Sequence, residues 1–263
     1  GNVIIMGTAE PATLAATTFT VTVTDAAAVT SAKTFALTVN GALTTTQAVA
    51  SRTGTIGTLI ATFTPVTASG GTAPFAFALT GGTLPTGMSF NATNGQVSGT
   101  PSATLATTTF TVTVTDAATA TSSKTFALTV NSALATTQVV PATAGTIGTL
   151  IASFTPVTAS GGTVPYAFAL SGGALPTGMT FNATTGLVSG TPLTTLAATA
   201  FTVTVTDAAG AISANTFSLT VNSALTTTQA VAATAGTVNT LVPSFTPVAA
   251  SGGTVPYAFA LTT

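Results

Sequence analysis

Carboxylates are the side chains in this sequence that are best suited to transfer a proton or to bind a metal, and they are few. The chain of 263 residues has four acidic and three basic residues, and it has no His and no Cys. The acids are Glu10, Asp25, Asp116 and Asp207, and the three Asp residues are spaced 91 positions apart in VTDA motifs. General acid–base catalysis needs a titratable group tuned to its task, and nucleophilic catalysis needs a base beside the nucleophile. Because neither arrangement can form from isolated acids, we predict no catalytic residue and no enzyme activity.

The same spacing argues against a metal site and a cofactor. A calcium ion takes about six to eight oxygen ligands, and several of them are usually carboxylates. One Asp in each VTDA motif is too few, unless backbone carbonyls complete the coordination shell, so we predict neither a metal nor a cofactor. We expect Asp25, Asp116 and Asp207 to cap turns instead, by accepting hydrogen bonds from nearby backbone N–H groups.

Two Asn residues are candidates for covalent modification. Asn91 and Asn182 each begin an N-A-T triplet, which matches the acceptor pattern for N-linked glycans. Both lie in an expected turn, where Asn is also favoured for its backbone geometry, so the turn role and the glycan role are alternatives. The Thr residues of the TVTVT runs could carry O-linked glycans, bind ice or polysaccharide, or simply serve as exposed strand residues.

The elements that would position these residues are β-strands. Phe110, Val112 and Val114 alternate with Thr, and the same alternation returns after a short turn from Phe126 to Val130. A period of two is typical of an antiparallel strand with one buried face. The segment therefore predicts a hairpin with an apolar inner face and a Thr-rich outer face.

The hairpin pattern recurs along the chain and defines a tandem array. Phe19, Phe110 and Phe201 occupy the same place in successive copies, 91 positions apart. Short strands separated by Gly, Pro and Asn turns predict an all-β sandwich for each repeat. The expected divisions are the C-terminal half of a repeat at 1–40, complete repeats at 41–131 and 132–222, and the N-terminal half of a repeat at 223–263.

Charge is unusually scarce. Only 3% of the residues are charged, against about 25% in an ordinary soluble domain, and the net charge is −1. The chain thus lacks the basic surface that nucleic acids or anionic membranes attract, and it lacks an apolar run long enough to span a bilayer as a helix. The N-terminal residues do not match a signal peptide, so we expect a mature or truncated chain. So little charge gives weak self-repulsion, which favours a surface that is assembled or covered.

A family resemblance is carried by LPTGMSFNATNGQVSGTP, followed by FTVTVTDA and FALTVN. This run resembles the He_PIG repeat of bacterial surface proteins, an immunoglobulin-like family related to cadherin-like modules. The resemblance covers both complete repeats and, in halves, both ends. It implies tandem Ig-like antiparallel sandwiches of about seven strands per 91-residue repeat, an extracellular or cell-surface location, and a spacer, adhesive or fibre-forming role. Cadherin-like relatives often hold calcium between domains, and one Asp per repeat departs from that pattern.

These observations favour a structural subunit or segment of an extracellular bacterial fibre, stalk or surface protein. Residues 1–40 and 223–263 correspond to the back and the front of one repeat, so either the array is longer or copies join head to tail by strand complementation. The expected partners are further copies of the chain and covalent glycans, with no nucleic acid and no membrane span. The alternative is an adhesin or carbohydrate-binding repeat that uses the ASGGTAP and GGTLPTG loops. The near identity of these loops between copies favours the spacer.

Overall fold

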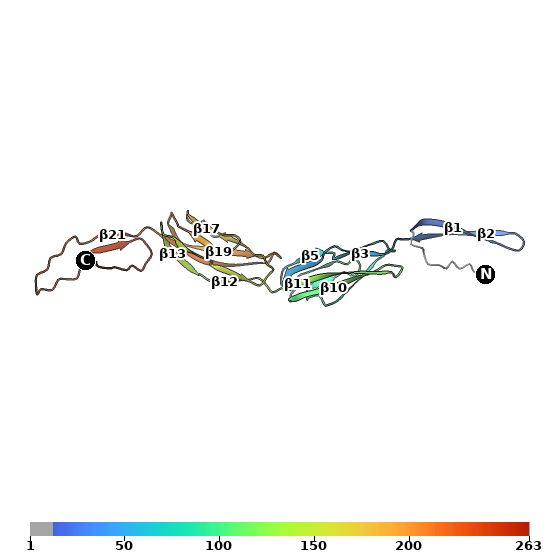
Figure 1. Ribbon diagram of the computed structural model, residues 1–263, viewed down its shortest axis with the longest axis horizontal. Helices are drawn as coiled ribbons and strands as arrows, with labels where there is room; N and C mark the ends of the chain where they lie inside the picture. Colours follow the sequence, from blue (N-terminus) through green and yellow to red (C-terminus); the bar gives the residue numbers. More distant parts are fainter. Residues whose placement is uncertain (1–12, 263) are drawn as a thin grey trace. The chain divides into compact units, whose positions relative to one another are not determined.

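The computed structural model describes residues 13–262 of the chain. Glu10, the first part of the predicted half-repeat at 1–40 and Thr263 therefore lie outside the described residues. Contacts divide the chain into two units, Gly1–Asn131 and Ser132–Thr263, which are coloured from blue through green and from yellow-green to red in Figure 1. Every regular element of the described residues is a β-strand, so the predicted all-β class is confirmed.

The first unit contains a complete sandwich. Its four-stranded sheet has the order β4-β11-β10-β7, and its other strands form the sheet β5-β9-β8 and the pair β3-β6. The strands are β3 (Thr44–Gln47), β4 (Ser51–Thr55), β5 (Ile60–Phe63), β6 (Val66–Ser69), β7 (Ala76–Thr80), β8 (Met88–Phe90), β9 (Val97–Gly99), β10 (Leu105–Thr115) and β11 (Thr121–Asn131).

The second unit contains a sandwich of the same design. Its sheets have the orders β13-β20-β19-β16, β14-β18-β17 and β12-β15. The strands are β12 (Ala135–Gln138), β13 (Ala142–Thr146), β14 (Ile151–Phe154), β15 (Val157–Ser160), β16 (Ala167–Ser171), β17 (Met179–Phe181), β18 (Val188–Gly190), β19 (Leu196–Thr206) and β20 (Ile212–Asn222).

The first two extended segments of each sandwich are each divided into two short strands, which the sequence pattern did not predict. In the first sandwich these are β3 and β4, followed by β5 and β6. Pro65 separates β5 from β6 because it has no N–H to donate, and its carbonyl accepts hydrogen bonds from the N–H groups of Ala48 and Val49 at 2.8 and 3.1 Å. At that point the chain leaves β3, which pairs with β6, and enters β4, which pairs with β11. The β4–β11 pair is parallel, so the expected antiparallel sandwich contains one parallel pairing at its edge.

The sandwich core is built on the alternation of the two long strands. Phe110, Val112 and Phe126 are almost completely buried, whereas the intervening Thr residues face outward, as predicted. The rings of Phe110 and Phe126 stack with centroids 5.5 Å apart, and Phe63 meets Phe126 edge-on at 5.9 Å. The second sandwich repeats this aromatic trio with Phe201, Phe217 and Phe154.

The residues before the first sandwich form a hairpin, which we call the N-terminal hairpin. It consists of β1 (Leu14–Thr24) and β2 (Thr30–Val39), shown in blue in Figure 1. Its register matches that of β10 and β11, because Phe19 faces Phe35 just as Phe110 faces Phe126. The two rings stack at 5.5 Å, so this pair forms without the rest of a sandwich.

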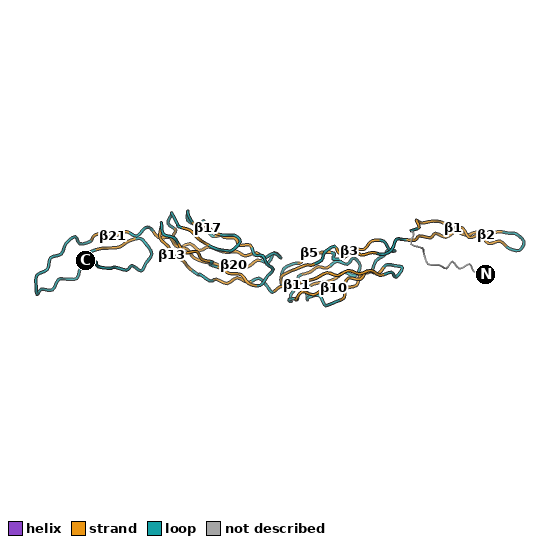
Figure 2. Tube along the Cα trace, in the orientation of Figure 1, coloured by secondary structure: helices purple, strands orange, loops and turns teal. Residues whose placement is uncertain are grey.

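Residues 223–262, which we call the C-terminal segment, contain two short strands. These are β21 (Thr226–Gln229) and β22 (Val248–Ser251), which pair with each other as β3 and β6 do. The segments that correspond to β4, β5 and β7 form no strand here, and Figure 2 draws most of this part as teal loop. In the first sandwich, β4, β5 and β7 pair with β11, β9 and β10, respectively. The described part of the C-terminal segment has no counterpart of these three partners.

We expect Phe110→Ala to lower the free energy of unfolding of the first sandwich by about 3–5 kcal/mol, because a fully buried ring is replaced by a cavity. Thr113→Ala, on the outward face of the same strand, should change it by less than about 0.5 kcal/mol. Urea denaturation measures both variants. Equal losses of stability would show that the core is misassigned.

Candidate functional site

The strand edges and apolar faces of the N-terminal hairpin are the first candidate site. In the complete sandwich, the outer edge of β10 pairs with β7 and the outer edge of β11 pairs with β4. Within residues 13–262, strands β1 and β2 pair only with each other. Phe19 is 39% exposed and Val23 is 60% exposed, although their counterparts Phe110 and Val114 are fully buried. Among the described residues, the hairpin thus has two unpaired edges and an apolar face that a sandwich would cover.

The C-terminal segment has the complementary features. Phe245, Phe259 and Leu261 are exposed, and Leu261 reaches 98%. Their counterparts in the first sandwich, Phe63 and the β7 side chains, pack against the core. The segment therefore carries the apolar residues that would cover a long-strand hairpin, and no such hairpin lies on them within the described residues.

The aromatic trio is divided between these two parts of the chain. Phe19 and Phe35 of the N-terminal hairpin form the stacked pair. The ring that completes the trio edge-on is Phe63 in the first sandwich and Phe154 in the second. The residue 91 positions after Phe154 is Phe245, in the C-terminal segment.

The Asp residues of the VTDA turns are the second candidate site. In the first sandwich, Oδ1 of Asp116 accepts hydrogen bonds from the N–H groups of Ala118 and Ala120 at 3.0 and 2.8 Å. Its Oδ2 accepts a third bond, at 2.8 Å, from the N–H of Thr72 in the SGGT loop. Asp116 is 6% exposed. Its carboxylate joins two loops that are far apart in the sequence, because it accepts hydrogen bonds from both.

The VTDA turn of the second sandwich also contacts an SGGT loop, whereas the VTDA turn of the N-terminal hairpin has only local donors among the described residues. Asp207 repeats the geometry of Asp116, with Ala209, Ala211 and Thr163 as donors at 2.9, 2.7 and 2.8 Å. Asp25 is exposed, and its Oδ1 accepts bonds from Ala27 and Val29 at 2.9 and 2.8 Å. Charged acceptors of this kind make hydrogen bonds about twice as strong as neutral ones.

Each Asp lies in its own turn, and residues 13–262 contain no cluster of three or more His, Cys, Asp or Glu side chains. In the complete sandwiches, the carboxylate oxygens accept hydrogen bonds from backbone N–H groups, whose positive ends face the oxygens where a cation would have to bind. The bond from Thr72 to Asp116 was not predicted from the sequence. A signal for it exists, because the SGGT and VTDA motifs occur together in each complete repeat.

Asn91 and Asn182 lie in the turns that follow β8 and β17, and both are exposed. Oδ1 of Asn91 accepts bonds from the N–H groups of Thr93 and Asn94 at 2.8 and 3.3 Å, and Asn182 does the same with the equivalent residues. Later in the same turn, Gly95 has a positive φ of 71° and Asn94 does not, so the turn is not the two-residue type in which both central residues have a positive φ.

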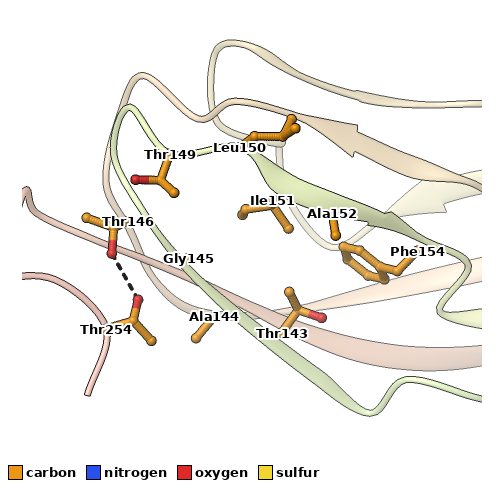
Figure 3. A pocket seen from close by; sticks show the side chains of 10 residues that line it. All are labelled: Thr143, Ala144, Gly145, Thr146, Thr149, Leu150, Ile151, Ala152, Phe154 and Thr254. Carbon is orange, nitrogen blue, oxygen red and sulfur yellow. Dashed lines mark hydrogen bonds between the residues drawn. The ribbon is translucent and has the colours of Figure 1, made fainter. Parts of the chain in front are cut away.

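A pocket of about 440 Å³ lies beside β13 and β14 in the second unit (Figure 3). Its walls are Thr, Ala and Gly residues together with Leu150, Ile151 and Phe154, and no charged side chain lines it. In the first sandwich, Arg52 takes the place of Thr143 and its guanidinium lies 5.8 Å from the ring centre of Phe63. The pocket offers neither a charge nor a nucleophile with a base.

The described part of the chain holds no helix with the length and hydrophobicity of a bilayer-spanning segment.

We expect Asp116→Asn to lower the free energy of unfolding of the first sandwich by about 1–3 kcal/mol, because an amide cannot accept on both sides. Hydrogen exchange followed by mass spectrometry should report this loss in residues 41–131 and leave 132–222 unchanged. The matched control is Lys124→Asn, since Asn215 occupies this place in the second sandwich. An effect of equal size in the control would contradict the role of the carboxylate.

Calcium should not change the unfolding temperature, because the carboxylate oxygens of the complete sandwiches already accept backbone hydrogen bonds. Scanning calorimetry with calcium chloride and with a chelator is the measurement. A rise of the unfolding temperature that depends on calcium concentration would identify a metal site.

Comparison with family models matches the He_PIG family, described as "Putative Ig domain", over residues 42–131 and 133–222. Comparison with curated proteins gives no match. Similar solved structures include the titin I-band fragment I67–I69 (14% identity, TM-score 0.47, 69% of this chain and 66% of that one) and extracellular domains 3–5 of Drosophila OTK (14%, 0.43, 78% and 71%). The chain spans just under two thirds of the titin fragment. Because the family model matches more than half of the chain, in two tandem copies, this protein belongs to the He_PIG family of Ig-like domains.

Proposed function

We propose that this protein is a non-catalytic structural subunit or segment of an extracellular bacterial fibre, stalk or surface protein, whose copies assemble head to tail by strand complementation. The observation that carries the proposal is the match between the two incomplete parts of the chain. Within residues 13–262, the N-terminal hairpin has no edge strands beside it, and the C-terminal segment leaves the corresponding sequences unpaired.

The backbone supports this match strand by strand. Among the described residues, no counterpart of β7 pairs with the outer edge of β1, and residues 258–262 have the same AFALT sequence as β7. Nor does a counterpart of β4 pair with the outer edge of β2 within residues 13–262. Residues 233–237 have the same ATAGT sequence as β13, which fills that place in the second sandwich. Extended segments of this kind add to free sheet edges through main-chain hydrogen bonds, so a neighbouring copy can supply both strands.

The side chains support the same pairing. A docked C-terminal segment would cover Phe19 and Val23 of the next copy, and it would bury its own Phe259 and Leu261 in return. Each such side chain contributes about 1.5–3 kcal/mol when it is fully buried. Phe245 would meet Phe35 edge-on and complete the aromatic trio, in the geometry that Phe63 and Phe126 adopt. Aromatic anchors of this type dominate the binding energy of protein interfaces.

Family membership and composition support an extracellular structural role. The He_PIG resemblance implies bacterial surface proteins, and a surface with 3% charged residues suits a chain whose faces are covered by neighbours or by glycans. Exposed Asn91 and Asn182 are the proposed glycan acceptors. The adhesin alternative has less support, because the SGGT loops are nearly identical between copies and the pocket in Figure 3 contains no charged side chain.

The test is self-assembly of the purified chain, measured by sedimentation velocity over a series of concentrations and by negative-stain electron microscopy. We expect filaments that lengthen with concentration, and we expect Phe245→Ala to raise the concentration required by at least about tenfold. Leu241→Ala is the matched control, because Leu241 is exposed and its counterparts Leu59 and Leu150 stay exposed inside complete sandwiches.

A chain that stays monomeric at all concentrations would overturn the assembly proposal. It would indicate that other sequence completes the N-terminal hairpin and the C-terminal segment. Filaments that are equally sensitive to Phe245→Ala and Leu241→Ala would show assembly through a different surface.

A further inference from the structure

In each complete sandwich, a pair of hydrogen bonds, which we call the latch, connects the VTDA turn to the SGGT loop. The N–H of Thr72 donates to Oδ2 of Asp116 at 2.8 Å, and the N–H of Ala117 donates to the carbonyl of Thr72 at 2.8 Å. The second sandwich has the same two bonds, between Thr163 and Asp207 and between Ala208 and Thr163, also at 2.8 Å. The latch therefore joins the turn between the two long strands to the SGGT loop.

The N-terminal hairpin contains the acceptor side of a latch, the Asp25 turn, in the conformation that this turn has in the complete sandwiches. The Asp25 N–H donates to the carbonyl of Val29 at 2.9 Å, and the Ala28 N–H donates to the carbonyl of Asp25 at 3.0 Å. Ala28 has a φ of 63°, close to the 66° of Thr119 in the first sandwich. Among the described residues, nothing donates to Oδ2 of Asp25, although its Oδ1 has two donors. The acceptor is thus formed and exposed.

The C-terminal segment contains the donor side, an SGGT loop, in the conformation that this loop has in the complete sandwiches. Gly252 and Gly253 have φ values of 70° and 61°, and the N–H of Gly253 donates to the carbonyl of Ser223 at 2.7 Å, as in the complete SGGT loops. A Cβ at Gly71 would lie 2.8 Å from Oδ2 of Asp116, so glycine leaves the space that the carboxylate occupies. Gly253 keeps this space open, and the N–H of Thr254 has no acceptor among residues 13–262.

We propose that Asp25 and Thr254 of neighbouring copies form this latch, and that it sets the register of the joint. The inference rests on the proposed head-to-tail assembly and names the polar contact that makes it specific. The apolar pattern alone is a weak guide, because TVTVT and AFAL look the same after a slip of two residues. A slipped joint would bury Asp25 with its Oδ1 bonded in the turn but with no donor to Oδ2, which is costly. Only the correct register places Thr254 against Asp25.

The test is Asp25→Asn in the full chain, compared with Lys33→Asn in the same hairpin. The amide oxygen of Asn can keep the two bonds to Ala27 and Val29, but its NH₂ group then faces the Thr254 N–H. In the opposite orientation the amide loses the turn bonds instead, so either orientation breaks part of the arrangement. Lys33→Asn changes one exposed charge at a place where Asn215 already occurs in the second sandwich.

We expect Asp25→Asn to raise the critical concentration for filament formation by about tenfold to a hundredfold, while Lys33→Asn leaves it unchanged. Hydrogen exchange should show the Thr254 amide protected in wild-type filaments and unprotected in any filaments of the variant. Wild-type filaments with an unchanged critical concentration in Asp25→Asn and an exchanging Thr254 amide would overturn the latch and leave the assembly proposal intact. Absence of wild-type filaments would overturn both.

Discussion

A stacked pair of phenylalanines, one from each of the two long strands, forms the centre of each sandwich core. Phe110 and Phe126 hold the first sandwich, and Phe201 and Phe217 hold the second. The N-terminal hairpin forms the same pair but leaves it partly exposed. The pair is a local product of hairpin register, whereas its burial requires strands from elsewhere. That difference separates a complete sandwich from an incomplete one.

Because charged residues are scarce, two buried carboxylates have a large part in selecting the correct strand register and packing. The outward faces of the long strands carry Thr and Ser, which hydrogen-bond weakly and in many ways, so they distinguish poorly between registers. Asp116 and Asp207 are buried and bind three backbone N–H groups each. A buried carboxylate is costly unless its donors are in place, so one residue per repeat can reject incorrect packing that the apolar pattern would accept.

The sequence was a good guide to local features and a poor guide to long-range ones. The alternation from Phe110 to Val114 and the turn after Asp116 could be predicted because each depends on residues close together in the chain. The parallel edge strand β4 and the bond from Thr72 to Asp116 could not, because both depend on how distant segments cross in space. The break at Pro65 has a local cause, the missing N–H, but only the fold places this break beside Ala48 and Val49, where the chain passes from β3 to β4.

The pentapeptide AFALT occurs twice in the described residues with two different backbone structures. The sequence determined its period of two, and therefore which of its side chains share a face. Residues 76–80 form strand β7 because β10 lies beside them, and the identical residues 258–262 form no strand. A strand needs an external partner for its backbone hydrogen bonds, so its formation depends on a neighbour that its own sequence cannot supply.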